Sequence, residues 1–267
     1  MTGKSRGRIA AGIVALTVAV AACGYDNASG PGYGDSTTVA AVKSSPRVIA
    51  ATGSLTAALK EFRHQLGDSV NKTAGEQATG RREINWDGVS GVLLNVDTFP
   101  GDFFNRVVPR GQIFTTDGSG FRVSDNALAD LNPSYASEFA AFSPTKIFIA
   151  AGSRAMTVHF VVAGSLTPAL VNGFGVVFTD VDVERGTTMS FFDAQGRLLQ
   201  KVSAPTRSDA AGFSFVGVTF TAPIVATVRI VSGQARITGL NTDVSAGGSA
   251  DLVAMDDFIS GEPHPIQ

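Results

Sequence analysis

Three carboxylates follow one another at every second position near the middle of the chain. Asp180, Asp182 and Glu184 lie in the apolar run GFGVVFTDVDVE, residues 173–184. Side chains alternate between the two faces of a β-strand, so a strand here would present all three carboxylates on one face. Such a set could do acid/base chemistry, bind a metal ion or form a solvated surface, and the spacing alone leaves these alternatives open.

The spacing resembles the Glu-x-Asp-x-Glu strand of jelly-roll glucanases, in which the outer carboxylates act as nucleophile and acid/base. Asp180, Asp182 and Glu184 would then form the catalytic set of a glycoside hydrolase. The first position here is Asp, which is one methylene shorter than Glu, whereas retaining hydrolysis needs carboxyl groups about 5 Å apart. A sugar cleft also needs aromatic platforms, and the chain has one Trp and three Tyr. The hydrolase is therefore the less favoured alternative.

A calcium site is the alternative that the acidic residues favour more. Calcium binds roughly six to eight hard oxygens from carboxylates, amides and backbone carbonyls. Among the residues on expected strands, the acidic ones are most concentrated at Asp180, Asp182, Asp256 and Asp257. If the last strand lies beside strand 174–182, either Asp256 or Asp257 points inward, and burying it without a cation or donors would cost on the order of several kcal/mol. We expect these four residues to hold calcium, with solvated strand ends as the alternative.

A polar group around the single tryptophan could bind a sugar. Trp86 could stack on a sugar ring while Asn85 and Asp87 bond its hydroxyls. The alternative is that Trp86 fills the core and its two neighbours shape a turn. Asp102 and Asn105, in the segment PGDFFN, have the same two interpretations. These five residues form the expected ligand-binding set.

Motifs of other enzyme classes are absent from the sequence. There is no G-x-S-x-G, P-loop, H-E-x-x-H or CxxC motif. His64, His159 and His264 lie in unrelated segments, which argues against a zinc site or a catalytic triad. No catalytic residue is assigned, and a non-enzymatic function is favoured.

The elements that position these residues are mainly strands. One short amphipathic helix is expected between Ser54, as its N-cap, and Gly67, where it ends, because Leu and Phe recur there at helical spacing. After residue 84 the sequence consists of short β-branched and aromatic runs separated by turn residues. The expected strands are 111–115, 120–124, 146–150, 155–163, 174–182, 187–193, 197–203, 212–221, 224–232, 234–239 and 251–259.

This many strands favours two sheets packed face to face. The predicted fold is mainly β: a two-sheet antiparallel β-sandwich of the jelly-roll, lectin-like type with one short N-terminal helix. It forms a single domain over residues 47–263, followed by a tail at 264–267. Its clearest hairpin turns at Asp193 and Gly196. Most of the 18 phenylalanines are expected in its core.

The N-terminus predicts export. Residues 1–22 combine three basic residues with a short apolar run, as in a secretory signal peptide. They end in VAAC, which resembles the lipobox of bacterial lipoproteins and implies lipidation at Cys23, the only cysteine. Residues 23–46 are rich in Gly, Ser, Thr and Pro and are expected to be a flexible tether. We therefore expect the protein to be anchored to a membrane by the lipid on Cys23. Its expected location is the bacterial cell envelope, at the outer membrane or the cell surface.

The charge balance argues against nucleic-acid binding. The chain has 21 basic and 23 acidic residues, and residues 1–22 hold three of the basic and none of the acidic ones, so the mature chain carries a net charge of −5. Nucleic-acid binding needs a basic face that neutralises phosphate.

Five segments together resemble a group of secreted bacterial proteins that have no established activity. They are GRREINWDGV (80–89), PGDFFN (100–105), RGQIFTTDGSGFRVS (110–124), GFGVVFTDVD (173–182) and LVAMDDFISGEP (252–263). The resemblance implies a lectin-like jelly-roll sandwich. The MDDF segment is also similar to the last strand of carbohydrate-binding modules, in which carboxylates often hold structural calcium.

We therefore expect a non-catalytic binding module, with a glycan or another envelope component as ligand and with structural calcium. The hydrolase alternative predicts β-glucan cleavage that Glu184→Gln abolishes. A purely structural envelope protein predicts no glycan affinity, together with an exposed apolar patch or a free sheet edge.

Overall fold

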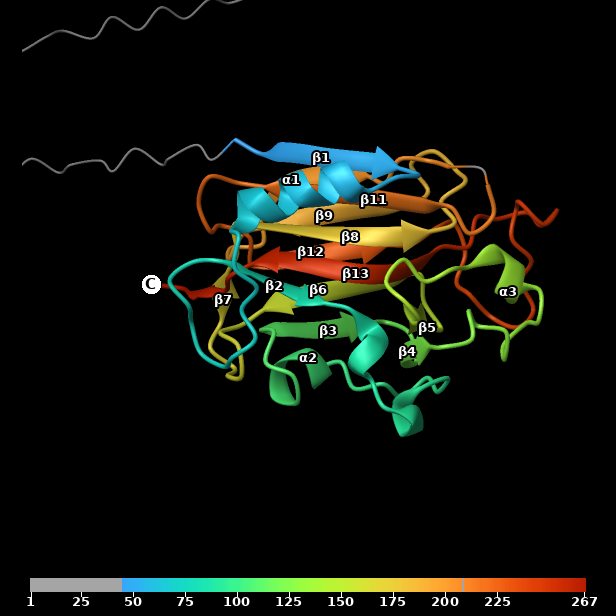
Figure 1. The fold of residues 1–267 in the computed structure, drawn as a ribbon, viewed down its shortest axis with the longest axis horizontal. Coiled ribbons are helices and arrows are strands. Elements are labelled where there is room, and N and C mark those ends of the chain that lie inside the picture. The colour runs from blue at the N-terminus through green and yellow to red at the C-terminus, as the bar shows by residue number, and fades with distance from the viewer. Residues whose placement is uncertain (1–44, 208) are drawn as a thin grey trace, which may run out of the picture. The chain divides into compact units, whose positions relative to one another are not determined.

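The computed structural model describes residues 45–207 and 209–267, which form two large antiparallel sheets and one short two-stranded sheet (Figure 1). The expected signal peptide 1–22, the lipidation site Cys23 and nearly all of the expected tether lie outside the described residues. The strands are β1 (Arg47–Thr52), β2 (Arg81–Ile84), β3 (Gln112–Thr116), β4 (Gly120–Ser124), β5 (Ile147–Ala151), β6 (Ala155–Phe160), β7 (Ala169–Leu170), β8 (Gly173–Thr179), β9 (Thr188–Phe192), β10 (Leu198–Ser203), β11 (Phe213–Thr219), β12 (Thr227–Val231), β13 (Ala254–Gly261) and β14 (His264–Pro265). The helices are α1 (Thr56–Leu66), α2 (Phe103–Arg106) and α3 (Tyr135–Glu138), with 3₁₀ turns η1 (Trp86–Gly88) and η2 (Gly91–Leu93).

The strand order is that of a jelly roll. The larger sheet runs β1-β11-β8-β13-β5-β4, with β2 also paired to β13, and the smaller sheet runs β10-β9-β12-β6-β3. Strands β5-β13-β8-β11 of the larger sheet and β6-β12-β9-β10 of the smaller sheet together have the connectivity of an eight-stranded jelly roll. Every strand pairing within the two sheets is antiparallel. The predicted mainly β, two-sheet antiparallel sandwich is confirmed.

The main core lies between the two sheets. Phe174, Val176 and Phe178 of β8 contribute to it at every second position, as alternation along a strand requires. Trp86 is fully buried in this core and stacks on Phe148, with ring centroids 3.9 Å apart and planes 5° apart. The expected concentration of phenylalanine in the core is therefore present.

Helix α1 covers part of the outer face of the larger sheet, over β1 and β11 (Figure 1). Phe62 is fully buried against Gly175 and Gly217, which are cross-strand partners in β8 and β11. A Cβ atom at either glycine would come within 2.8 Å of the Phe62 ring, so the helix can sit here only because both side chains are absent. The helix ends at Gly67 as predicted, but its N-cap is Leu55, so the prediction of Ser54 was wrong.

Strand β13 changes partners halfway along its length. Met255 pairs with β5, whereas the half that begins at Phe258 pairs with β2 on the same side. Against β8 on the other side, the register shifts between Met255 and Phe258. Asp256 and Asp257 lie in this irregularity, and the Trp86 indole donates a 2.8 Å hydrogen bond to the Asp256 carbonyl. The bulge explains why neighbouring acidic side chains need not point to opposite faces.

Several boundaries differ from those predicted. Residues 234–239 form no strand, and strand β8 ends at Thr179 rather than at residue 182. Strands β1 and β2 were not predicted; β2 reads RREI, and its charges conceal a strand pattern. The expected tail at 264–267 contributes β14, which pairs with β7. No helix within the described residues has the length and apolar composition needed to cross a membrane.

Candidate metal site

Two loops and one helix meet where β8 ends and β13 begins. Because Thr179 pairs with Ala254, the residues after β8 and those before β13 share one edge of the sheet. Asp180 follows β8 directly and has a left-handed φ of +68°, which turns the chain out of the strand. Its backbone N–H still donates to the Gly212 carbonyl at 2.9 Å, so the turned residue is fixed in place.

Five carboxylates gather at this edge. Glu138, Asp180 and Asp243 each place an oxygen within 4.8 Å of the others, and so do Asp182, Asp243 and Asp251. Asp243 belongs to both sets and joins them into one group, which we call the acidic cluster. Glu138 comes from α3, while the other four come from the loops beside β8 and β13.

Four of the five residues are buried and Asp182 is half-buried, and several of the carboxylate oxygens have no hydrogen-bond partner. Asp180 and Asp251 have no exposed surface, and Asp243 is 1% exposed. Both side-chain oxygens of Asp180, both of Asp182 and Oδ1 of Asp243 are buried without a hydrogen-bond partner. A buried carboxylate without donors is strongly unfavourable unless it is protonated or binds a cation.

Part of the cluster is positioned by hydrogen bonds. The two oxygens of Asp251 accept the backbone N–H groups of Asp182 and Val183 at 3.3 and 3.1 Å. Glu138 Oε2 accepts the Ser245 hydroxyl at 2.6 Å. These bonds fix the loops and orient the carboxylates, but they leave the remaining oxygens free to bind a cation.

Burial and mutual repulsion raise the pKa values in the cluster. Burial, the proximity of Asp243 and the charges of Asp182 and Glu138 raise the pKa of Asp180 to about 9. Burial and the nearby acidic charges raise the pKa of Asp251 to about 6, and burial above all raises the pKa values of Asp182 and Asp243. None of the five carboxylates forms an ion pair with a Lys, Arg or His in residues 45–207 and 209–267.

The donor set fits a hard cation. The grouped side chains supply oxygen only, which suits calcium rather than zinc, whose usual ligands are nitrogen and sulfur. Backbone carbonyls from the loops could complete the roughly six to eight oxygens that calcium binds. A divalent cation would neutralise charges that the described protein leaves unpaired.

Asp180 and Asp182 therefore lie in the cluster, as the predicted calcium site requires, but Asp256 and Asp257 do not belong to it. They form a separate pair in the β13 bulge, where Ser143 Oγ lies 3.1 Å from Asp256 Oδ1 and 2.8 Å from Asp257 Oδ1. Burial and the charge of Asp257 raise the pKa of Asp256 to about 8. The expected grouping of all four residues is corrected, because the bulge holds the second pair in its own set of donors.

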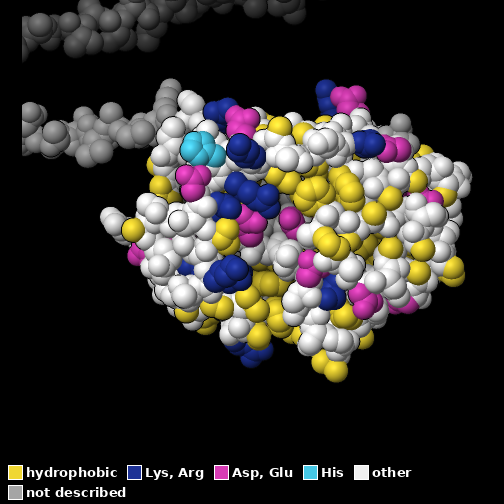
Figure 2. Space-filling view, in the orientation of Figure 1, with side chains coloured by type: hydrophobic (Ala, Val, Ile, Leu, Met, Phe, Trp, Pro, Cys, Tyr) yellow, Lys and Arg dark blue, Asp and Glu magenta, His cyan; other side chains and the backbone are white. Residues whose placement is uncertain are grey.

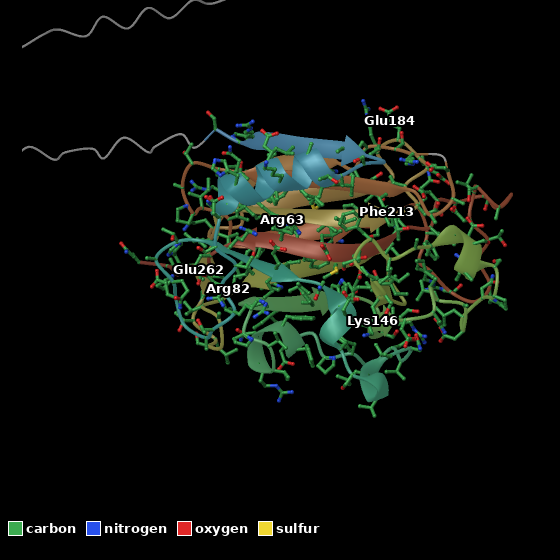
Figure 3. All side chains as sticks on the ribbon, in the orientation of Figure 1. Arg63, Arg82, Lys146, Glu184, Phe213 and Glu262 are labelled. Atoms are coloured by element: carbon green, nitrogen blue, oxygen red, sulfur yellow. The ribbon has the colours of Figure 1, made fainter. Side chains whose placement is uncertain are left out.

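Glu184 lies apart from both acidic residues that precede it. Its side chain is 82% exposed and lies 3.5 Å from that of Arg185. Figure 3 shows it at the upper edge of the folded part of the molecule. The period-two pattern does not continue past Thr179, so Asp180, Asp182 and Glu184 do not share a strand face, and the hydrolase alternative loses its geometric basis.

The expected sugar-binding group around Trp86 is dispersed. Trp86 is buried in the core and offers no face to a ligand, so its interpretation as a sugar platform was wrong. Asn85 is exposed. Asp87 binds the segment that follows α3: its carboxylate accepts the Thr145 N–H and its carbonyl accepts the Lys146 ammonium. This geometry matches the alternative of a core tryptophan beside a turn.

The second expected ligand-binding pair also contributes to the fold. Asn105 is 4% exposed; its amide donates to the Ser165 carbonyl at 2.7 Å and accepts the Gly164 N–H at 2.8 Å. It thereby fixes the loop before β7. Asp102 precedes α2 and pairs with Arg106 at 3.2 Å on the surface.

Three members of the cluster were not predicted: Glu138, Asp243 and Asp251. Asp243 and Asp251 flank the Gly- and Ser-rich segment before β13, and Glu138 lies in a helix of only four residues. The pairing of the last strand with strand 174–182 could have indicated Asp243 and Asp251, because it places the residues before β13 beside Asp180.

The fold and the site together define a jelly-roll β-sandwich with a buried acidic cluster. No protein-family model and no curated protein sequence matches the chain. Among solved structures, a family 35 carbohydrate-binding module from Clostridium thermocellum aligns with 57% of this chain and 88% of its own, at 6% identity and a TM-score of 0.25. A likeness at this TM-score carries no argument, and the fold assignment rests on the strand order.

Proposed function

We propose that the protein is a calcium-stabilised, non-catalytic binding module of the bacterial cell envelope. The observation that carries the calcium part is Asp180, whose two oxygens are buried without a partner inside a group of five carboxylates. One calcium ion would link α3 to the loops around β8 and β13. Asp180, Asp182, Asp243, Asp251 and Glu138 would supply the ligands.

A carbohydrate or another envelope component is the proposed ligand of the module. The jelly-roll architecture supports this at the level of the fold, since lectin domains use it, although a fold alone does not determine function. The five sequence segments that resemble secreted bacterial proteins support an exported sandwich, but they do not identify its ligand. The separation of Glu184 from Asp180 and Asp182 favours binding over hydrolysis.

Export and lipid anchoring at Cys23 complete the proposal, and the basic and apolar signal segment that ends in VAAC supports them. Metabolic labelling with palmitate should mark the wild type and not Cys23→Ala. Equal labelling of both proteins would contradict lipidation at this residue.

Thermal unfolding with and without calcium tests the central part. A ligand that binds only the native state at 100 times its Kd adds about 2.7 kcal/mol, which corresponds to roughly 5–10 °C in Tm for a chain of this size. We expect that rise in millimolar calcium chloride and its reversal by a chelator. An unchanged Tm would contradict the calcium site.

A further inference from the structure

A groove with a volume of about 470 Å³ lies beside α1 on the outer face of the larger sheet. Its lining includes Lys60, Arg63 and His64 from the helix and Asp68, Arg81 and Phe142 from facing segments. Figure 2 shows basic and acidic side chains close together on this face, with apolar side chains beside them and a hollow between. Cavities of this size hold small ligands such as short oligosaccharides.

The charged groups at this groove are fixed by one another. Arg63 donates through Nε and Nη2 to the two oxygens of Glu83, both at 3.0 Å, and Arg81 Nε donates to Glu83 Oε1 at 2.6 Å. Hydrogen bonds from Arg81 and Arg63 outweigh the effect of burial and hold the pKa of Glu83 below its usual value. Side chains held in place by such contacts are pre-organised for a ligand.

A gap between Arg63 and Asp257 leaves hydrogen-bonding capacity unused. Arg63 Nη2 lies 3.9 Å from Asp257 Oδ2, which is too far for a direct hydrogen bond. Asp257 binds the Ser143 hydroxyl through its other oxygen and is 7% exposed. A hydroxyl group in the groove beside Arg63 could accept from the guanidinium and donate to the Asp257 carboxylate, which borders the groove behind Arg63.

An aromatic side chain lines the same groove. Phe142 packs edge to face against Phe213, with ring centroids 5.4 Å apart and planes 80° apart. Its backbone N–H donates to Asp256 Oδ2, which ties the residue to the β13 bulge. Figure 3 shows Arg63 and Phe213 on the same face of the sheet, near opposite ends of α1. The groove therefore combines a fixed ring with fixed donors and acceptors.

We propose that this groove binds an uncharged saccharide, with Phe142 against a sugar ring and a sugar hydroxyl beside Arg63 that bridges it to Asp257. Arg63 and Arg81 already share the Glu83 carboxylate, and Lys60 is the one lining Lys or Arg without an ion pair in residues 45–207 and 209–267, so the groove offers little uncompensated charge to an anion. Paired charges with spare donors and acceptors suit hydroxyl groups. The proposal rests on the binding function proposed above and assigns it a site, different from the residues around Trp86.

Native gel electrophoresis of the full chain in mild detergent, in gels containing one soluble polysaccharide each, tests the groove. The neutral probes are arabinoxylan, mixed-linkage β-glucan, galactomannan and dextran, and polygalacturonate is the anionic probe. At least one neutral polysaccharide should retard the protein. Phe142→Ala and Arg63→Gln should each weaken binding about tenfold or more, the loss typical of one well-placed contact.

Arg229→Gln is the matched control, because Arg229 is exposed on β12 in the opposite sheet. It should leave retardation unchanged. Thermal unfolding of both groove variants with calcium confirms that they are folded. Retardation that survives both groove variants would overturn the groove but keep the binding function. Retardation by polygalacturonate alone would overturn the uncharged ligand, and no retardation by any probe would overturn saccharide binding, while the calcium measurements would stand independently.

Discussion

Asp180 and Asp243 place carboxylate oxygens within 4.8 Å of each other, although both residues are buried and neither forms an ion pair within residues 45–207 and 209–267. Two such charges repel each other strongly at low dielectric. The fold nevertheless brings three further carboxylates to the same place. A bound divalent cation accounts for this arrangement, and the predictions below depend on it or on the residues that surround it.

Asp180→Asn should remove most of the calcium response. Asn tolerates the left-handed φ of +68° at this position and has nearly the same shape, so the substitution changes charge without adding backbone strain. In thermal unfolding, the rise in Tm caused by calcium should largely disappear. The calcium-free variant should be at least as stable as the wild type at pH 10, where the wild-type carboxylate, with its pKa of about 9, is charged and the amide is not.

Glu184→Gln is the matched control for that variant, since it removes a nearby carboxylate that is 82% exposed. It should keep the full calcium response. A full response in Asp180→Asn, or an equal loss in both variants, would contradict the assignment of Asp180 as a ligand.

Calcium-free protein should lose stability as the pH rises. Between the ordinary pKa of aspartate, about 4, and the pKa of Asp180, about 9, the folded state binds more protons than the unfolded state. The free energy of unfolding therefore falls across this range. The stabilisation is complete below pH 4 and is lost as the pH passes through the raised pKa values.

Urea unfolding of calcium-depleted protein at pH 5, 7 and 9 measures this trend. Saturating calcium should flatten it, since the ion displaces the protons. Part of the slope should remain, because Asp256, with a pKa of about 8, lies outside the cluster. Stability that rises from pH 5 to pH 9 without calcium would be inconsistent with buried, repelling carboxylates.

The fluorescence of Trp86 should show that its side chain is shielded from water and from ligands. As the single tryptophan, it accounts for all indole fluorescence, and it has no exposed surface. Its emission should be blue-shifted and poorly quenched by acrylamide in the native protein. Addition of a polysaccharide that retards the protein in gels should leave the spectrum unchanged. Strong quenching, or a spectral change on binding, would restore Trp86 as a ligand contact.

Arg82 and Glu262 should be the ion pair on which stability depends most. Their side chains are 0% and 1% exposed, and Arg82 donates to both Glu262 oxygens, at 2.6 and 2.8 Å (Figure 3). Arg82 also donates to the carbonyls of Thr73 and Gly75 in the loop before β2, and to the carbonyl of Pro109 before β3, which fixes both loops. Arg82→Met leaves a buried carboxylate unpaired and should cost about 3–5 kcal/mol in urea unfolding.

Arg106→Met is the control for that substitution. Arg106 pairs with Asp102 on the surface, where the two side chains are 70% and 43% exposed. Its loss should cost less than about 1 kcal/mol. Similar costs for the two variants would show that the buried pair does not determine stability in the way proposed.

The class of fold was predictable because most strands have a local sequence pattern, either alternating apolar residues or a recognisable turn. The alternation of Phe174, Val176 and Phe178 marks β8, and Asp193 with Gly196 marks the β9–β10 hairpin, where the Asp193 N–H bonds the Arg197 carbonyl at 3.1 Å. Strand β2 was missed because Arg82 is buried on it, and only a distant partner, Glu262, makes that burial possible.

Only part of the candidate site could be predicted from the sequence. Asp180 and Asp182 were found because they are close in sequence to an apolar strand. Glu138, Asp243 and Asp251 were not found, because their proximity depends on the β8–β13 register and on loops without a local pattern. The bulge at Asp256 and Asp257 likewise arises from a change of partner along β13, which local alternation does not encode.

Calcium content per chain tests the central claim most directly. The purified protein, equilibrated with calcium and freed of excess by gel filtration, is analysed by inductively coupled plasma mass spectrometry alongside Asp180→Asn. The wild type should carry at least one calcium ion per chain, and Asp180→Asn should carry one fewer, with Glu184→Gln unchanged. A wild type without bound calcium, or the same content in Asp180→Asn, would contradict a calcium site in the acidic cluster.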